Sequence, residues 1–471
     1  MNILHISAEC YPAAKVGGLA DVAAALPKYM NKAGHKAELI MPYYNNKFFR
    51  DHSWEVVRES DFNLGVTAYP YRILKEKTDT LGFTLFTTEI PGLLTEEFPY
   101  GYWNDVQRHL GFQIAVADWL SHTSDLPDVI HCHDHHSGLL PFMIDYCFRY
   151  NSLKDIPTVF TIHNGSYHGA FSRDQSSLIP PFDNWKTGML EWTNAINPMA
   201  SAIKCCWRFT TVSRSYLQEL QQYALGLESL IVSERQKSLG ILNGIDTELW
   251  DPATDSYLEK NYTTDTVTSG KIKNKSALCE EFGLDPEKML VVFIGRLVSD
   301  KGADLLPESI IQSVSEYEDK VNFIVLGSGD GRLENNLTSL AATLPASFQN
   351  YIGYNEKLAH LIYGGADFLL MPSRVEPCGL NQLYALRYGT IPIVTATGGL
   401  KDTVLDLAMA GGFGIRFEEA VVRNIVNAIG RAVLLFEDEE KFSEIRKQIM
   451  TIDHSWQHAV KEYLDLYSSM K

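Results

Sequence analysis

The stretch that decides the fold is NILHIS at positions 2–7, which is followed by KVGGLAD at positions 15–21. The first run is short, mostly apolar and bounded by polar residues, which is typical of a buried strand. Gly17 and Gly18 then open a helical pattern that continues to about position 33, and a second strand is predicted over 37–42. This order of strand, loop, helix and strand is the βαβ unit of a parallel sheet.

The same alternation continues along the chain. In the first half, a helix is predicted over 105–119, and further strands over 83–88, 128–132, 158–162, 209–212 and 238–242. The stretch 251–273 is polar with little periodicity, and we interpret it as a linker or surface excursion. The alternation then restarts, with helices predicted over 304–316 and 332–342 and strands over 289–295, 322–326, 348–352, 366–371 and 391–394.

The predicted fold class is therefore α/β, with two successive doubly wound, Rossmann-like parallel sheets. We place the domains at 1–242 and 243–454. In open sheets of this kind the ligand binds at the carboxyl ends of the strands, so the cleft between two such sheets is the expected site.

Composition narrows the function classes. The chain has 471 residues with 41 Lys and Arg against 58 Asp and Glu, and 41 − 58 = −17. That net charge argues against a nucleic-acid-binding protein. The seven cysteines are odd in number and irregularly spaced, which favours free thiols in a reducing compartment. We find neither a signal peptide nor an apolar run of about 18 residues, so we expect a cytoplasmic protein without a membrane partner.

A histidine-rich motif, HCHDHH at positions 131–136, follows a predicted strand. It nearly matches the H-x-H-x-D-H pattern of binuclear metallohydrolases, but the aspartate, Asp134, comes one place early. We therefore favour a polar strand end that faces the cleft, with a metal site as the alternative. A second histidine, His163, also ends a predicted strand.

Other motifs suit a phosphorylated sugar. The backbone at Gly17 and Gly18 permits close approach of a ligand, and amide groups at a helix start favour phosphate. Arg296 and Lys301 follow a strand and could hold an anionic leaving group. Glu376 lies between prolines and a glycine, where its carboxylate could hold a sugar hydroxyl.

Two further observations argue against other classes of protein, the dinucleotide-binding proteins and the metal-dependent nucleotide-sugar transferases. The turn GSGDGR at 327–332 lacks the third glycine of a dinucleotide-binding fingerprint, so we interpret it as an ordinary βα turn. No two aspartates are separated by one residue, so the Asp-x-Asp element of metal-dependent nucleotide-sugar transferases is absent.

Taken together, the motifs resemble the bacterial glycogen synthases and plant starch synthases over nearly the whole chain. The shared motifs, in family order, are KxGGL (15–19), HxHD (131–134), TIHN (161–164), ILNGID (241–246), GRL (295–297) with KG (301–302), and EPCGL (376–380). The resemblance implies a GT-B fold with the two domains facing across a cleft. It also implies transfer of glucose from a nucleotide sugar to the non-reducing end of an α-1,4-glucan, with retention of configuration.

The resemblance also implies roles for individual residues. Arg296 and Lys301 would neutralise the donor diphosphate, Glu376 would hold the donor glucose, and His163 would lie beside the sugar. These four are the expected catalytic residues. The expected substrate-binding residues are Lys15, Gly17, Gly18, Asp21, Asp134, Asn164, Asn243, Tyr354, Cys378, Gly379 and Leu380. Tyr354 would stack on the nucleotide base, and the segment 455–471 would form a helix that crosses back to the first domain.

No metal and no pyridoxal phosphate are implied as cofactors, and the expected partners are the nucleotide-sugar donor and a glycogen acceptor. ADP-glucose is the expected donor. Val16, Asn381 and the pair Thr395-Ala396 depart from common bacterial members, which leaves UDP-glucose open as the alternative. The rival classes are a pyridoxal-dependent phosphorylase, a metallohydrolase and a non-catalytic glucan-binding protein.

Overall fold

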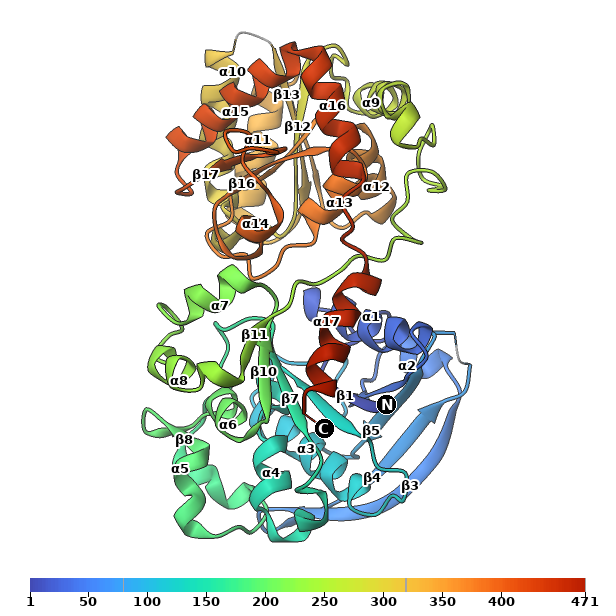
Figure 1. Cartoon of the computed structure of the whole chain (residues 1–471), viewed down its shortest axis with the longest axis vertical. Helices are drawn as coiled ribbons and strands as arrows, with labels where there is room; N and C mark the ends of the chain where they lie inside the picture. Colours follow the sequence, from blue (N-terminus) through green and yellow to red (C-terminus); the bar gives the residue numbers. More distant parts are fainter. Residues whose placement is uncertain (79, 318–319, 471) are drawn as a thin grey trace. The chain divides into compact units, whose positions relative to one another are not determined.

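The chain divides into two units, and the computed structural model describes residues 1–78, 80–317 and 320–470 (Figure 1). The first unit contains Met1–Ile241 and Trp456–Lys471, and the second contains Leu242–Ser455. Lys471, the last position of the predicted closing helix, lies outside the described residues. Each unit has its own central sheet.

The sheet of the first unit is built around β1 (Asn2–Ile6), which pairs in parallel with β2 on one side and with β6 on the other. Strands β2 to β5 lie on one side of β1, and β6 and the later strands lie on its other side. The direction in which the chain adds strands to the sheet therefore reverses between β1 and β6. After β1, the other described strands of this sheet are β2 (Lys36–Pro42), β3 (Trp54–Leu64), β4 (Thr67–Glu76), β5 (Thr84–Glu89), β6 (Val129–His133), β7 (Thr158–Ile162), β10 (Arg208–Thr211) and β11 (Ser238–Gly240). Their spatial order is β11-β10-β7-β6-β1-β2-β5-β4-β3.

One edge of this sheet is antiparallel, which the sequence did not predict. Strands β3 and β4 form a hairpin, and β4 pairs antiparallel with β5. Most β3 side chains are exposed or half-buried, and only Phe62 and Leu64 are buried. An edge strand of this kind lacks the apolar alternation that marks a strand in sequence.

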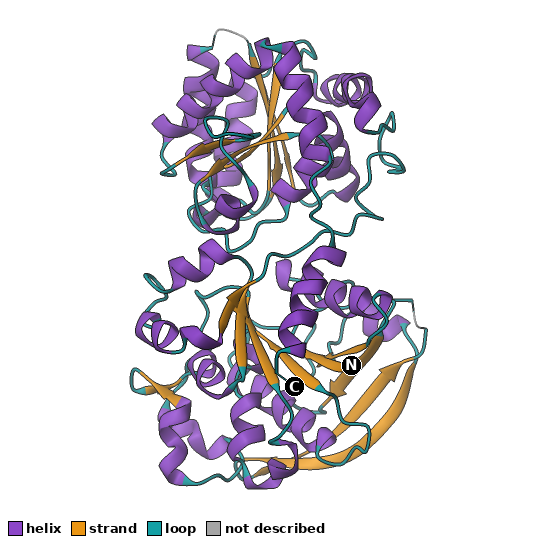
Figure 2. Cartoon of the chain, in the orientation of Figure 1, coloured by secondary structure: helices purple, strands orange, loops and turns teal. Residues whose placement is uncertain are grey.

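The sheet of the second unit is entirely parallel and has the same kind of reversal, here between β12 and β15. In spatial order its strands are β14 (Phe348–Ile352), β13 (Val321–Gly327), β12 (Met289–Ile294), β15 (Phe368–Met371), β16 (Ile391–Thr395) and β17 (Ile415–Phe417). Both faces are covered by helices (Figure 2). Met289, Val291 and Phe293 pack into one core and Leu290 and Val292 into another, which explains the continuous apolar run.

Helices connect the strands in both units, and none of those described is long and apolar enough to cross a membrane. In the first unit they are α1 (Gly18–Lys32), α2 (Lys47–Asp51), α3 (Asp105–Leu120), α4 (Leu140–Tyr146), α5 (Thr187–Leu190), α6 (Pro198–Cys205), α7 (Arg214–Leu220), α8 (Glu228–Ser233) and α17 (Trp456–Ser468). In the second unit they are α9 (Val267–Phe282), α10 (Leu306–Glu316), α11 (Gly331–Thr343), α12 (Glu356–Gly365), α13 (Asn381–Arg387), α14 (Gly398–Thr403), α15 (Val422–Glu437) and α16 (Glu439–Met450).

The interpretation of 251–273 as a linker or surface excursion is wrong over its last seven residues, 267–273, whereas 251–263 contain no helix or strand. Helix α9 begins at Val267, inside this stretch, and its Lys271 is buried. The Lys271 ammonium donates hydrogen bonds to the carbonyls of Tyr363, Gly364 and Tyr388 and to the Thr390 hydroxyl, at 2.7–3.2 Å. A buried lysine whose hydrogen bonds are satisfied by buried oxygens cannot be told from a surface lysine by composition. The polar composition of this stretch therefore did not reveal the start of the helix.

Helix α17 belongs to the first unit although the second unit precedes it in the chain. It packs beside α1 (Figure 1), and Trp456, Tyr463 and Tyr467 share a core cluster with Ile3 of β1 and Leu26 of α1. The core of the first unit is thus built from both ends of the described chain.

Candidate active site

The predicted site residues gather at the carboxyl ends of strands, beside the point in each sheet where the strand order reverses. In the first unit, β1 leads to the loop that contains Gly17 and Gly18 (the glycine loop), and β6 ends at His133, next to Asp134. In the second unit, β12 leads to Arg296 and Lys301, and β15 leads to Glu376. Reversal points of this kind open a crevice at the strand ends, which is where ligands bind in such sheets.

The glycine loop of the first unit is held by Glu9, which the sequence did not single out. The buried Glu9 accepts hydrogen bonds through Oε2 from the backbone N–H groups of Val16 (2.6 Å) and Gly17 (3.0 Å). The Tyr100 hydroxyl donates to its other oxygen. Burial raises the pKa of this carboxyl. An acidic residue three positions after the end of a buried strand was the available signal.

Gly17 and Gly18 face open space. A Cβ atom added at either glycine would meet no atom within 4 Å. The packing of the chain therefore does not require glycine here, and the space is available to a ligand. We call the candidate site residues of one unit a half-site. Lys15 and Asp21, which are also predicted for the half-site of the first unit, form an ion pair with each other at 2.8 Å.

Asp134 organises the loop after β7. Its backbone has a positive φ of 54°, and its Oδ1 accepts hydrogen bonds from the backbone N–H groups of His163 (2.8 Å) and Asn164 (3.5 Å). Burial raises the pKa of Asp134 to about 7. The structure thus brings three of the predicted residues of the first unit together.

His163 is buried and hydrogen bonded to a second histidine. Its Nε2 lies 2.9 Å from Nδ1 of His133, whose Nε2 lies 3.1 Å from Nδ1 of His5. Burial lowers the pKa of His163 to about 3, and it lowers the pKa of His5 to about 3 as well. Strands β1 and β6 contribute one ring each to this row of neutral histidines, and the third ring, His163, directly follows β7.

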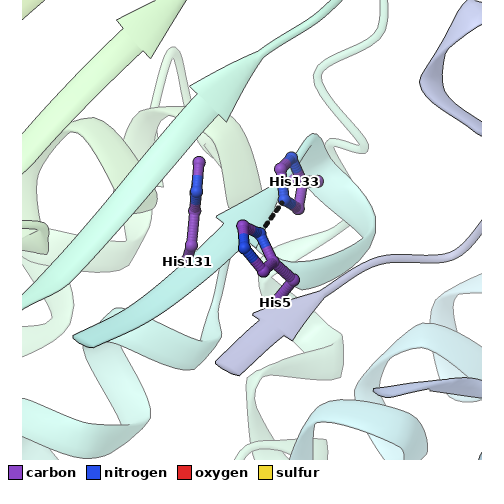
Figure 3. Close-up of side chains that lie close together, drawn as sticks. All are labelled: His5, His131 and His133. Atoms are coloured by element: carbon purple, nitrogen blue, oxygen red, sulfur yellow. Dashed lines mark hydrogen bonds between the residues drawn. The ribbon is translucent and has the colours of Figure 1, made fainter. Parts of the chain in front are cut away.

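The arrangement does not favour the metallohydrolase alternative. His5, His131 and His133 bring ring nitrogens within 4.8 Å of one another and could hold a metal (Figure 3). Both nitrogens of His131 already contact hydroxyls, Thr161 and Tyr467, at 2.6 Å each. His135 and His136 lie in a different group, in contact with each other with ring centroids 3.8 Å apart and the rings tilted by 36°. The histidines of HCHDHH therefore do not converge on one centre.

In the second unit, Lys301 and Glu376 are in direct contact. The Lys301 ammonium donates to Oε2 of Glu376 at 2.6 Å, and the Ser373 hydroxyl donates to the same oxygen at 3.0 Å. Glu376 is buried, whereas Lys301 is partly exposed. Ser373, three residues before Glu376, was not predicted from the sequence.

Arg296 and Tyr354 are exposed. Within the part of the chain that the structure describes, the guanidinium of Arg296 has neither a hydrogen-bond nor an ion-pair partner, so its charge is available to an anion. Tyr354 follows β14 with 78% of its surface exposed. An exposed ring of this kind can stack on a base.

The loop around Glu376 contains the remaining predicted residues. The Asn243 backbone donates to the buried Cys378 thiol, and Oδ1 of Asn243 is buried without a hydrogen-bond partner among the described residues. Gly379 has a φ of 75°, where L side chains are strained, and Leu380 leads into α13. An unsatisfied buried acceptor beside this loop is a position that a ligand donor can fill.

Comparison with known proteins bears on both units. Residues 2–233 match the family model described as the starch synthase catalytic domain, and residues 274–449 match the model described as glycosyl transferases group 1. A glycogen synthase of Flavobacterium johnsoniae is 49% identical over 468 residues, which is 99% of each chain. The chain belongs to the glycogen synthase family. A family member from Bacillus cereus is 36% identical and matches over the full length of both chains.

Solved structures agree with this family. The catalytic domain of starch synthase IV from Arabidopsis thaliana, bound to ADP and acarbose, matches with a TM-score of 0.89 at 30% identity, over 100% of this chain and 99% of that one. A sucrose-phosphate synthase from Thermosynechococcus elongatus matches with a TM-score of 0.64 at 15% identity, over 100% and 98%, which shows the fold alone. The predicted family and the GT-B fold are confirmed, and the glycogen synthase relatives identify the chain as a glycosyltransferase.

Proposed function

We propose that this chain transfers glucose from ADP-glucose to the non-reducing end of an α-1,4-glucan such as glycogen, with retention of configuration and without a metal ion. What supports the proposal most is the contact between Lys301 and Glu376 at the reversal point of the second sheet, together with Arg296, which follows β12 and whose guanidinium has no partner among the described residues. The alternative donor is UDP-glucose. The relative solved with ADP favours the adenine nucleotide.

The second unit would bind the donor. Arg296 and Lys301 supply two positive charges for the diphosphate, and the exposed ring of Tyr354 would stack on the base. Glu376 would hold the glucose hydroxyls through its carboxylate. Asn243, Cys378, Gly379 and Leu380 would line the sugar pocket next to it.

The first unit contains the remaining residues with proposed roles toward the donor. His163 would contact the donor glucose, and the open backbone at Gly17 and Gly18 would lie against the donor phosphates. Lys15 and Asp21 would line the same loop. Asp134 would act mainly by holding the backbone of His163 and Asn164 in place.

The charges fit the reaction. Cleavage of the bond between glucose and phosphate develops positive charge on the sugar ring and negative charge on the leaving diphosphate. Cations already in position stabilise that negative charge directly, so a metal is not obligatory. The leaving phosphate oxygen would take the proton of the acceptor hydroxyl as that hydroxyl bonds to the anomeric carbon on the same face.

The test is nucleotide release from ADP-, UDP- and GDP-glucose, each with and without glycogen. We expect glycogen-dependent release that is fastest from ADP-glucose and survives EDTA. Preference for UDP-glucose would support the alternative donor. Glycogen binding without nucleotide release would support a non-catalytic protein, and loss of activity in EDTA that a divalent ion restores would contradict the metal-free mechanism.

A further inference from the structure

Three histidine rings form an unbranched hydrogen-bonded chain behind the proposed site. The contacts run from Nδ1 of His5 to Nε2 of His133 (3.1 Å), and from Nδ1 of His133 to Nε2 of His163 (2.9 Å). Figure 3 shows the first of these contacts, with His131 standing apart from it. The two ends differ: Nε2 of His5 is buried without a partner among the described residues, whereas Nδ1 of His163 is not among the buried unpaired atoms.

The number of protons in this chain is fixed. Burial lowers the pKa of all three rings, so each is neutral and carries one N–H and one unprotonated nitrogen. Each contact between two nitrogens needs one proton, because two N–H groups would repel and two lone pairs would not bond. Only two arrangements of the protons, which we call proton orders, satisfy both contacts. In one order all three rings carry the proton on Nδ1, and in the other all three carry it on Nε2.

The buried end distinguishes the two orders. With the proton on Nε2 of each ring, His5 directs an N–H group into the interior with nothing to accept it. With the proton on Nδ1 of each ring, the interior atom is an unprotonated acceptor. Orphaned buried N–H groups are rarer in proteins than under-satisfied acceptors, so the second order is the favoured one.

We propose that His5 and His133 are positioning residues that hold His163 in the Nδ1–H tautomer, so that it offers a hydrogen-bond donor to the donor sugar. The contact between His163 and glucose belongs to the proposed function, on which this inference rests. The proton order itself depends only on contacts within the first unit.

The neighbouring His131 does not take part. Its two nitrogens contact the hydroxyls of Tyr467 and Thr161, and its ring only stacks against His133, with centroids 4.2 Å apart. A hydroxyl both donates and accepts, so either tautomer of His131 is satisfied. The row of hydrogen-bonded histidines thus ends at His5, inside the protein, where no described residue continues it.

The direct test is the tautomer of His163 in the unmodified protein. All 14 histidines can be labelled with ¹⁵N, and the His163 resonances are those lost in H163Q. At about pH 8, above the ordinary histidine pKa, we expect a protonated Nδ1 and an unprotonated Nε2 on His163. A protonated Nε2 would overturn the proposal.

Two nearly isosteric variants at His5 test whether the order is transmitted. The amide of H5N can donate to His133 as Nδ1 of His5 does, so His163 should keep its tautomer. The carboxylate of H5D can only accept, so it should reverse both hydrogen bonds and move the proton of His163 to Nε2. A folded H5D protein in which the carboxylate at position 5 is ionised, His133 is neutral and the His163 tautomer is unchanged would overturn the proposal, and the measurement on the unmodified protein stands even where H5D fails to fold.

Activity then separates this inference from the proposed function. Loss of one donated hydrogen bond should lower the kcat of H5D about 3- to 10-fold, with the Kd of ADP unchanged and H5N close to the unmodified protein. If H5D reverses the tautomer and kcat stays the same, the histidine chain is supported and the proposed contact of His163 with glucose is contradicted.

Discussion

The two half-sites occupy the same place in the same kind of sheet, yet they differ in chemistry. The centre of the first is buried and uncharged, with a row of neutral histidines behind His163. The second carries an exposed Arg296 and the ion pair of Lys301 with Glu376. The comparison teaches that strand topology selects the position of a site, whereas the residues at the strand ends select what it does.

The two units also differ in the surroundings of a glycine pair at the start of a helix. Gly17 and Gly18 face open space, whereas Gly398 and Gly399 pack against the backbone of the Glu376 loop. A Cβ on Gly398 would lie 2.1 Å from the Glu376 carbonyl oxygen, and the φ of Gly398 is 43°. One pair leaves room for a ligand, and the other lets two backbone segments meet.

The largest expected effect tests this difference. Gly398→Ala should lower the free energy of unfolding by about 4 kcal/mol, because overpacking against backbone and a positive φ each cost about 1–3 kcal/mol. Gly18→Ala is the matched control and should change it by less than about 0.5 kcal/mol while weakening donor binding. Urea unfolding of both variants checks this, and equal losses would contradict the contrast.

The positive charge of Lys301 in the second half-site should raise the rate of glucose transfer. Lys301→Ala should lower kcat about 10²- to 10³-fold, or about 3–4 kcal/mol, with a smaller change in donor affinity, because the charge it stabilises grows in the transition state. Lys320→Ala is the control, since that lysine makes a surface ion pair with Glu437 and precedes β13 at the opposite end of the strand. Steady-state kinetics with ADP-glucose separates kcat from KM, and an effect confined to KM would contradict the role.

The buried acid of the first half-site should make stability depend on pH. The pKa of Asp134 rises from 3.8 to about 7 on folding, so between these values the folded chain holds a proton that the unfolded chain has lost. Stability should therefore fall as pH rises from about 4 to about 7, by about 2–4 kcal/mol for this group. Asp134→Asn can still accept both backbone hydrogen bonds, but it removes the titration.

The measurement is urea unfolding of the unmodified protein and of Asp134→Asn across this pH range. The variant should gain stability relative to the unmodified protein as pH rises. A constant difference between the two proteins would show that folding does not raise the pKa of Asp134, contrary to the expectation.

The smallest effect concerns ADP, which has no sugar for Glu376 to hold. Glu376→Gln removes the negative charge beside Lys301, so ADP should bind equally well or up to about 10-fold more tightly, which is about 1.4 kcal/mol. Arg296→Ala should weaken ADP binding. Calorimetric titration of both variants decides the matter, and the opposite pattern would reverse the two assignments.

Much of the fold was predictable because burial leaves a pattern in the sequence. Strand β7 has the predicted bounds, since a continuous apolar and β-branched run between polar turns identifies it. Strand β14 also has the predicted bounds, although Gln349 and Asn350 interrupt its apolar residues. The β3–β4 hairpin was missed because its outer strand is mostly exposed, and β17 (Ile415–Phe417) because three residues are too few for a period. The start of α9 was missed because its buried polar residues, such as Lys271, have partners far along the chain.

The candidate site was predictable in its parts but not in its pairings. Lys301 and Glu376 were each expected from their motifs, yet their contact joins residues 75 positions apart. His5 lies inside a strand, where a histidine in an apolar run gives no functional signal, and only its parallel register with β6 brings it next to His131 and His133. Such neighbours depend on tertiary structure, which local patterns do not record.

The return of α17 to the first unit has a consequence for biosynthesis. Domains usually fold in the order in which the ribosome makes them. Here the core around β1 and α1 lacks Trp456, Tyr463 and Tyr467 until those residues have left the exit tunnel, whereas all of Leu242–Ser455 has been made by then. The second unit, although later in sequence than most of the first, is therefore the first that can fold completely, and the core of the first unit stays incomplete until α17 has been made.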